Sequence, residues 1–143
     1  MARVMKRFGI TGLLFLAGAF SVGLSGIGLS FGAAPGLTRT DSGGGVTVKV
    51  TYVHPQGEDG ARFEVALDTH SVNLDAYDLK TLSVVRDDLG KSYQPTKAEN
   101  NGSGHHREAT LTFSKLSPEA RVLELVIRDI AGVKERVFRW ELR

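Results

Sequence analysis

Cysteine is absent from this chain of 143 residues, and that absence excludes several classes of protein. Without cysteine there is no disulfide scaffold, no thiolate metal site, no cysteine nucleophile and no lipid-modified N-terminal cysteine. The length is that of one ordinary domain. A domain of this size without disulfides must be stabilised by the packing of its hydrophobic core.

Acidic residues are missing from the first 40 positions, which contain the basic residues Arg3, Lys6, Arg7 and Arg39. These four account for the positive net charge, because the remainder of the chain has 14 basic residues against 16 acidic ones. A nucleic-acid-binding domain presents a basic stripe or patch. We therefore expect no nucleic-acid partner for the body of the protein.

Charge of either sign is missing from Phe8 to Thr38, a run of 31 residues directly after the basic start. The most apolar part is L-L-F-L-A-G-A-F, residues 13–20, and glycine and serine dilute the rest. A basic start, a short apolar stretch and small residues at a cleavage point are typical of an export segment.

Two interpretations of this segment remain open. Residues 1–32 form a signal peptide, with Ser30 and Gly32 before a cleavage point at Ala33, or they stay attached as an N-terminal membrane anchor. About 20 apolar residues span a bilayer, so residues 8–32 are long enough for an anchor and would be the one membrane contact if uncleaved. Both interpretations predict an exported body, periplasmic or extracellular, since the positive end stays in the cytoplasm.

Small and polar residues fill positions 33–45, A-A-P-G-L-T-R-T-D-S-G-G-G. Such a composition cannot bury enough apolar surface to fold by itself. We expect a flexible linker there, followed by a single domain over 46–143.

Apolar residues alternate with polar ones from Val46 onward, which is the period of a β-strand. The pattern recurs in runs near residues 46–53, 61–67, 79–85, 107–113, 121–128 and 133–142, with a short edge strand around 91–95. Turn residues separate the runs, including 87–90, 100–104 and 131–132, and one helical turn is expected near Pro118. Short strands about ten residues apart predict an all-β fold, an immunoglobulin-like antiparallel β-sandwich of seven or eight short strands, preceded by the hydrophobic segment.

The inward positions of these runs predict the core. Its expected members are Val48, Phe63, Val65, Leu67, Leu82, Val84, Leu111, Phe113, Leu123, Leu125, Ile127 and Trp140.

Known catalytic motifs are also missing from the sequence. The one G-x-S-x-G match, residues 28–32, lies in the uncharged N-terminal run and not at the strand-to-helix turn that a nucleophile elbow requires. There is no H-E-x-x-H and no phosphate-binding loop with its lysine. Asp87 and Asp88 lie in a turn, where carboxylates are usually solvated. We therefore expect no enzyme activity and no cofactor.

Three of the four histidines lie in two short phrases, L-D-T-H-S-V-N-L-D at 67–75 and G-H-H-R at 104–107. Together with Asp78-Leu79, Asp87 to Gly90 and L-T-F at 111–113, these phrases resemble a family of small exported bacterial proteins. The resemblance covers about residues 46–113 and implies export and a β-sandwich body. It implies no catalytic residue, since no activity is attached to that family.

The alternation places Asp68, His70 and His106 on an outer face, with His105 and Arg107 on the core side. One interpretation is a structural latch, in which the polar groups of the two phrases bind loop backbone at one end of the sandwich. The alternative is a Zn or Cu site formed by His70, His105, His106 and Asp68. The sequence thus predicts an exported, non-catalytic binding or accessory module with an unidentified protein or small-ligand partner, or else a metal-binding module on those four residues.

Overall fold

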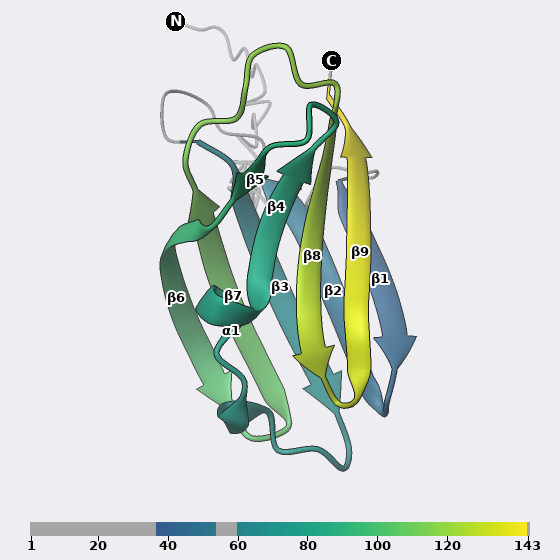
Figure 1. The fold of residues 1–143 in the computed structure, drawn as a ribbon. Coiled ribbons are helices and arrows are strands. Elements are labelled where there is room, and N and C mark those ends of the chain that lie inside the picture. Colours follow the sequence, from purple (N-terminus) through teal and green to yellow (C-terminus); the bar gives the residue numbers. More distant parts are fainter. Residues whose placement is uncertain (1–36, 54–59, 143) are drawn as a thin grey trace, which may run out of the picture. The chain divides into compact units, whose positions relative to one another are not determined.

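The structure is a computed structural model, and it describes residues 37–53 and 60–142. Two antiparallel sheets pack face to face (Figure 1). The larger sheet has five strands, in the order β1 (Thr38–Gly43), β2 (Val46–Val53), β3 (Arg62–Thr69), β7 (His106–Phe113) and β6 (Pro95–Ser103). The smaller sheet has four strands, in the order β5 (Ser92–Tyr93), β4 (Ser83–Asp87), β8 (Val122–Ile130) and β9 (Val133–Glu141).

The strand order confirms the immunoglobulin-like sandwich. Strands β2, β3, β7 and β6 take the places of the immunoglobulin strands A, B, E and D, while β4, β8 and β9 take those of C, F and G. Strand β1 lies outside β2, and β5 lies outside β4. The described residues therefore contain nine strands rather than seven or eight.

The strand period confirms most of the predicted core. Ten of the twelve expected positions join one buried cluster between the sheets, and Tyr52, Phe63, Phe113 and Trp140 stack within it with ring centroids 5.2–5.9 Å apart. Leu82 and Val84 do not join as expected. Leu82 is half-buried at the rim, and Val84 is buried outside the cluster, because Val85 is the residue of β4 that faces inward.

The run at 79–85 was wrongly predicted as a strand throughout. Its first half is the single-turn helix α1 (Leu79–Leu82), and a second short helix, η1 (Leu74–Ala76), precedes it. The Asp78 carboxylate accepts a hydrogen bond from the Lys80 amide and thereby caps α1. Near Pro118 the chain forms a turn without a helix.

The predicted linker is also corrected over its second half. Residues 38–43 form β1, which pairs in register with β2 from Thr38 opposite Thr51 to Gly43 opposite Val46. Gly44 and Gly45 have φ of 60° and 76°, which are the positive values of a two-residue hairpin turn. A Cβ on Gly44 would lie 2.1 Å from the Ala131 carbonyl oxygen, so this turn packs directly against the β8–β9 turn.

The β6–β7 turn is shorter than expected. Asn100 to Ser103 continue β6, and only Gly104 and His105 form the turn. The described part of the chain contains no helix long and apolar enough to cross a bilayer. The predicted signal peptide or anchor at 1–32 lies outside the described residues.

Candidate functional site

The two histidine-containing phrases meet at one end of the sandwich. The Thr69 amide donates to the His105 carbonyl oxygen at 3.0 Å, and the Leu74 amide donates to the Gly104 carbonyl oxygen at 2.9 Å. The Gly104 amide in turn donates to the Asp75 carboxylate at 2.9 Å. The loop after β3 and the β6–β7 turn are thus held together by two main-chain hydrogen bonds and by the Asp75 side chain.

Thr69 organises the first turn of that loop. Its hydroxyl accepts hydrogen bonds from the Ser71 and Val72 amides, each at 3.2 Å, and donates to the Gly45 carbonyl oxygen at 2.8 Å. A short hydroxyl side chain that binds backbone two and three residues ahead is a common way to fix a turn. Here it also joins the loop to the β1–β2 hairpin.

Arg107 is the central residue of this latch. It projects inward from β7, is only 9% exposed, and donates through Nη1 to the Leu74 carbonyl oxygen at 2.8 Å and also to the Tyr77 carbonyl oxygen. Its Nη2 donates to the Asn100 side-chain oxygen at 2.9 Å. One guanidinium therefore satisfies loop carbonyls that have left the sheet hydrogen-bonding pattern.

Asp68 and His106 are directly opposite each other on β3 and β7 and share the outer face, as the alternation predicts. The His106 Nδ1–H donates to the Asp68 carboxylate, while Nε2 lies 3.7 Å from the Glu108 carboxylate. The hydrogen bond and charge of Asp68 raise the pKa of His106, against a smaller effect of desolvation. This cluster is exposed, with 63% of the His106 side chain accessible.

The other two histidines do not join that pair. His105 lies exposed in the turn instead of on the core side, and its Nδ1–H donates to the Val72 carbonyl oxygen at 3.2 Å. His70 is exposed just after the end of β3. In residues 37–53 and 60–142, no group of three or more His, Asp or Glu side chains is placed to hold a metal ion. The metal site on His70, His105, His106 and Asp68 stays a prediction, which a melting experiment with added Zn²⁺ or Cu²⁺ would test.

Asp87 and Asp88 organise a turn, as the sequence predicts, but Asp87 is buried at the end of β4 and not solvated. Asp87 accepts from two amides, including that of Lys91 at 2.8 Å, and from the Tyr93 hydroxyl at 2.9 Å. Burial raises the pKa of Asp87, but these hydrogen bonds outweigh it and hold the pKa below its usual value. Asp88 accepts from the Arg121 and Val122 amides, which also lower its pKa.

Arg136 is a buried charge that the sequence reasoning missed. It lies on the inward face of β9 and is 1% exposed. Its guanidinium donates to the Asp41 carboxylate and to the Gly43 carbonyl oxygen, so it binds β1 to the opposite sheet. The signal was present, because the expected inward position of Trp140 extends by the strand alternation to Arg136.

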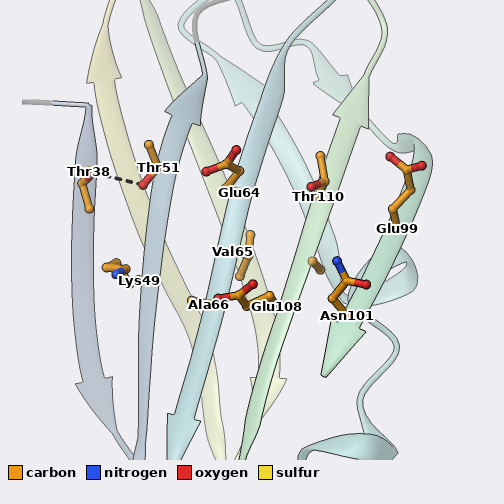
Figure 2. Close-up of a pocket in the computed structure, with 11 residues that line it drawn as sticks. Thr38, Lys49, Thr51, Glu64, Val65, Ala66, Glu99, Asn101, Glu108 and Thr110 are labelled. Atoms are coloured by element: carbon orange, nitrogen blue, oxygen red, sulfur yellow. Dashed lines mark hydrogen bonds between the residues drawn. The ribbon is translucent and has the colours of Figure 1, made fainter. Parts of the chain in front are cut away.

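A shallow polar groove of about 440 Å³ lies on the outer face of the five-stranded sheet. Its lining side chains come from two neighbouring rows across the strands, as Figure 2 shows. One row contains Thr38, Thr51, Glu64, Thr110 and Glu99, and the other contains Lys49, Ala66, Glu108 and Asn101.

Ala66 forms the low point between the charged side chains of the groove. Lys49 and Glu108 lie opposite Ala66 on the two neighbouring strands, and Figure 2 shows the Glu108 side chain directed toward β3 beside Ala66. Within the described part of the chain, Lys49 and Glu64 make no ion pair or side-chain hydrogen bond. The groove therefore contains two charged groups without a partner in the described residues, and it could not be predicted from the sequence because its residues are spread over five strands.

Comparison with known proteins adds little to this description. No protein family matches the sequence, and no curated protein matches it. The fold is similar to the crystal structure of MPT63, a secreted protein from Mycobacterium tuberculosis, at 15% identity and a TM-score of 0.38, over 74% of this chain and 91% of that one. A TM-score this low supports no conclusion about function, so the chain is described by its fold class, a small antiparallel β-sandwich. No family match supports the resemblance of the two histidine-containing phrases to a family of exported proteins.

Proposed function

We propose that this protein is an exported, non-catalytic binding module whose ligand surface is the groove on the outer face of the five-stranded sheet. The observation that carries the proposal is the pair of unpartnered charged groups, Lys49 and Glu64, beside the small side chain of Ala66. A groove of about 440 Å³ is within the usual size range of small-ligand sites. Export is supported by the basic start and the uncharged run of residues 8–38.

The latch at the end of the sandwich has a structural role in this proposal. The Thr69 hydroxyl binds backbone amide groups of the loop and the Gly45 carbonyl oxygen. The Arg107 guanidinium binds backbone carbonyl oxygens of the loop, including that of Leu74. Groups that already bind their own chain are less available to a ligand. Neither the latch nor the groove places a nucleophile beside a base in the described residues, which supports a non-catalytic role.

The binding part of the proposal is tested with an array of short peptides and small polar molecules, probed with the full-length chain. Ala66→Phe fills the low point of the groove while keeping a residue that strands accept. Glu141→Gln, an exposed carboxylate on the other sheet, is the matched control. The proposal predicts array members that bind the wild type and Glu141→Gln but not Ala66→Phe. An array with no such member would refute it.

The export part is tested separately, by fusing residues 1–40 to a reporter that is active only outside the cytoplasm. An active reporter is expected. A reporter that stays in the cytoplasm would refute export, and the mass of the exported product distinguishes cleavage before Ala33 from an uncleaved anchor.

A further inference from the structure

Charged residues are arranged differently on the two outer faces of the sandwich. On the four-stranded sheet they lie opposite residues of the other sign, so that Glu124 on β8 has Arg86 on one side at 3.8 Å and Arg139 on the other at 3.2 Å. Arg128 and Glu135 pair in the same way at 3.2 Å. This face neutralises its own charges.

On the face with the groove, His106 contacts Asp68 and Glu108 at one end of the sheet, but Lys49 and Glu64 have no residue of opposite charge directly across from them. Glu64 lies between Thr51 and Thr110 in its row, and Lys49 and Glu108 both lie opposite Ala66. Neutral small residues thus occupy the places where a partner of opposite charge would stand on the other face. Glu99, at the rim, is already paired with Lys97 at 2.8 Å, and this pair lowers the pKa of Glu99. The other two carboxylates that line the groove are those of Glu64, which has no partner in the described residues, and Glu108, which also lies 3.7 Å from His106 Nε2.

The spacing of those two carboxylates suits a particular kind of ligand. Glu64 is directly opposite Thr110, so Glu108 is its diagonal neighbour, and diagonal pairs on adjacent strands are about 7–8 Å apart. In an extended peptide, side chains two residues apart point to the same side and are separated by about 6.8 Å. Two basic side chains in the pattern Lys-x-Lys therefore match the two carboxylates.

The remaining groups of the groove favour a peptide over a simple polyamine. The Lys49 ammonium can only donate hydrogen bonds. A protonated polyamine has no acceptor for them, whereas a peptide carbonyl oxygen can accept them. The hydroxyls of Thr51 and Thr110 and the amide of Asn101 both donate and accept, as the backbone of a peptide requires. We propose that the groove binds an extended basic peptide segment with two cationic side chains at positions i and i+2, an inference that rests on the proposed function of the groove.

The test uses the full-length chain and isothermal titration at low salt with two peptides of equal charge. Ac-Ala-Lys-Ala-Lys-Ala-NH₂ places both lysines on one side when extended, and Ac-Ala-Lys-Lys-Ala-Ala-NH₂ places them on opposite sides. We expect the first to bind about fivefold more tightly, the effect of one exposed ion pair. Glu64→Gln and Glu108→Gln should each remove this difference, whereas Glu141→Gln should retain it.

Any of three titration results would overturn the inference: equal affinity for the two peptides, binding that Glu64→Gln and Glu108→Gln leave unchanged, or spermidine binding as tightly as the first peptide. The last result would mean that charge alone is recognised. Groove-dependent array members that are neutral or acidic would also overturn it, while leaving the proposed binding function intact.

Discussion

Replacing Arg107 by methionine should destabilise the protein strongly, because its guanidinium holds the loop that follows β3. Methionine keeps much of the apolar stem and removes only the donors. The Tyr77 carbonyl oxygen and the Asn100 side chain lose a charged donor, while the Leu74 oxygen keeps the Tyr77 amide at 3.2 Å. Bonds from charged donors contribute about 1.5–3 kcal/mol each, and a buried group left without a partner costs about 1–3 kcal/mol.

We therefore expect Arg107→Met to lower the free energy of unfolding by about 3 kcal/mol. The single tryptophan, Trp140, is buried in the core and reports unfolding in guanidinium chloride by its fluorescence. Arg62→Met, an exposed arginine on β3 in the same sheet, is the control and should change stability by less than about 0.5 kcal/mol. A loss below about 1 kcal/mol for Arg107→Met, or one equal to that of Arg62→Met, would refute the latch.

Three further predictions concern the core and the ion pairs. Leu125→Ala should cost about 2–5 kcal/mol in chemical denaturation, because Leu125 is fully buried between the sheets, and a loss typical of a surface site would show that the faces are inverted. The raised pKa of His106 means that its pairing with Asp68 stabilises the fold below about pH 6.5, the unfolded-state pKa, and that this contribution disappears as the pH rises through the higher folded-state pKa. Asp68→Asn should therefore destabilise the protein more at pH 5.5 than at pH 8, and an equal effect in melting curves at both values would contradict the pairing. Asp41→Ala should cost about 3 kcal/mol in stability, because it leaves the buried guanidinium of Arg136 without its carboxylate. Adding Arg136→Met to Asp41→Ala should recover stability. A double variant that is no more stable than Asp41→Ala alone would contradict this interpretation.

The fold was predictable because the strand period repeats in every long run. Val48 and Leu111 lie in runs where apolar and polar residues alternate, so a single choice of face places them both, and Leu125 lies in the most apolar run, where Val126 and Ile127 are buried as well. The same logic failed at 79–85. There the Asp78 cap forms one helical turn, which shifts the following strand by one residue and turns Val85 inward in place of Val84.

Strand β1 could not be predicted because its composition is that of a linker. T-R-T-D-S-G contains no apolar residue, so nothing marks it as a strand until it is seen to pair with β2. The glycines at 44 and 45 were interpreted as flexible, but their positive φ values form the turn of a two-residue hairpin. The buried bond from Arg136 to Asp41 then fixes this edge strand.

The candidate site was predictable only in part. The meeting of the two histidine phrases follows from the direct pairing of Asp68 with His106 on neighbouring strands, but the alternation could not show that His105 lies in a turn. The groove depends on which strands are neighbours and in what register. Glu64 and Glu108 are 44 positions apart in the sequence, and only the pairing of β3 with β7 brings them together.

The most direct test of the proposed binding surface is a map of the contact by nuclear magnetic resonance. Isotope-labelled full-length chain would be titrated with the tightest member of the array, and the shifted backbone amides would be assigned to the two faces of the sandwich. The proposal predicts that the largest shifts lie at Lys49, Ala66 and Glu108 and their neighbours on β2, β3 and β7. Shifts concentrated at Glu124 and Arg139 on the outer face of the four-stranded sheet would contradict it.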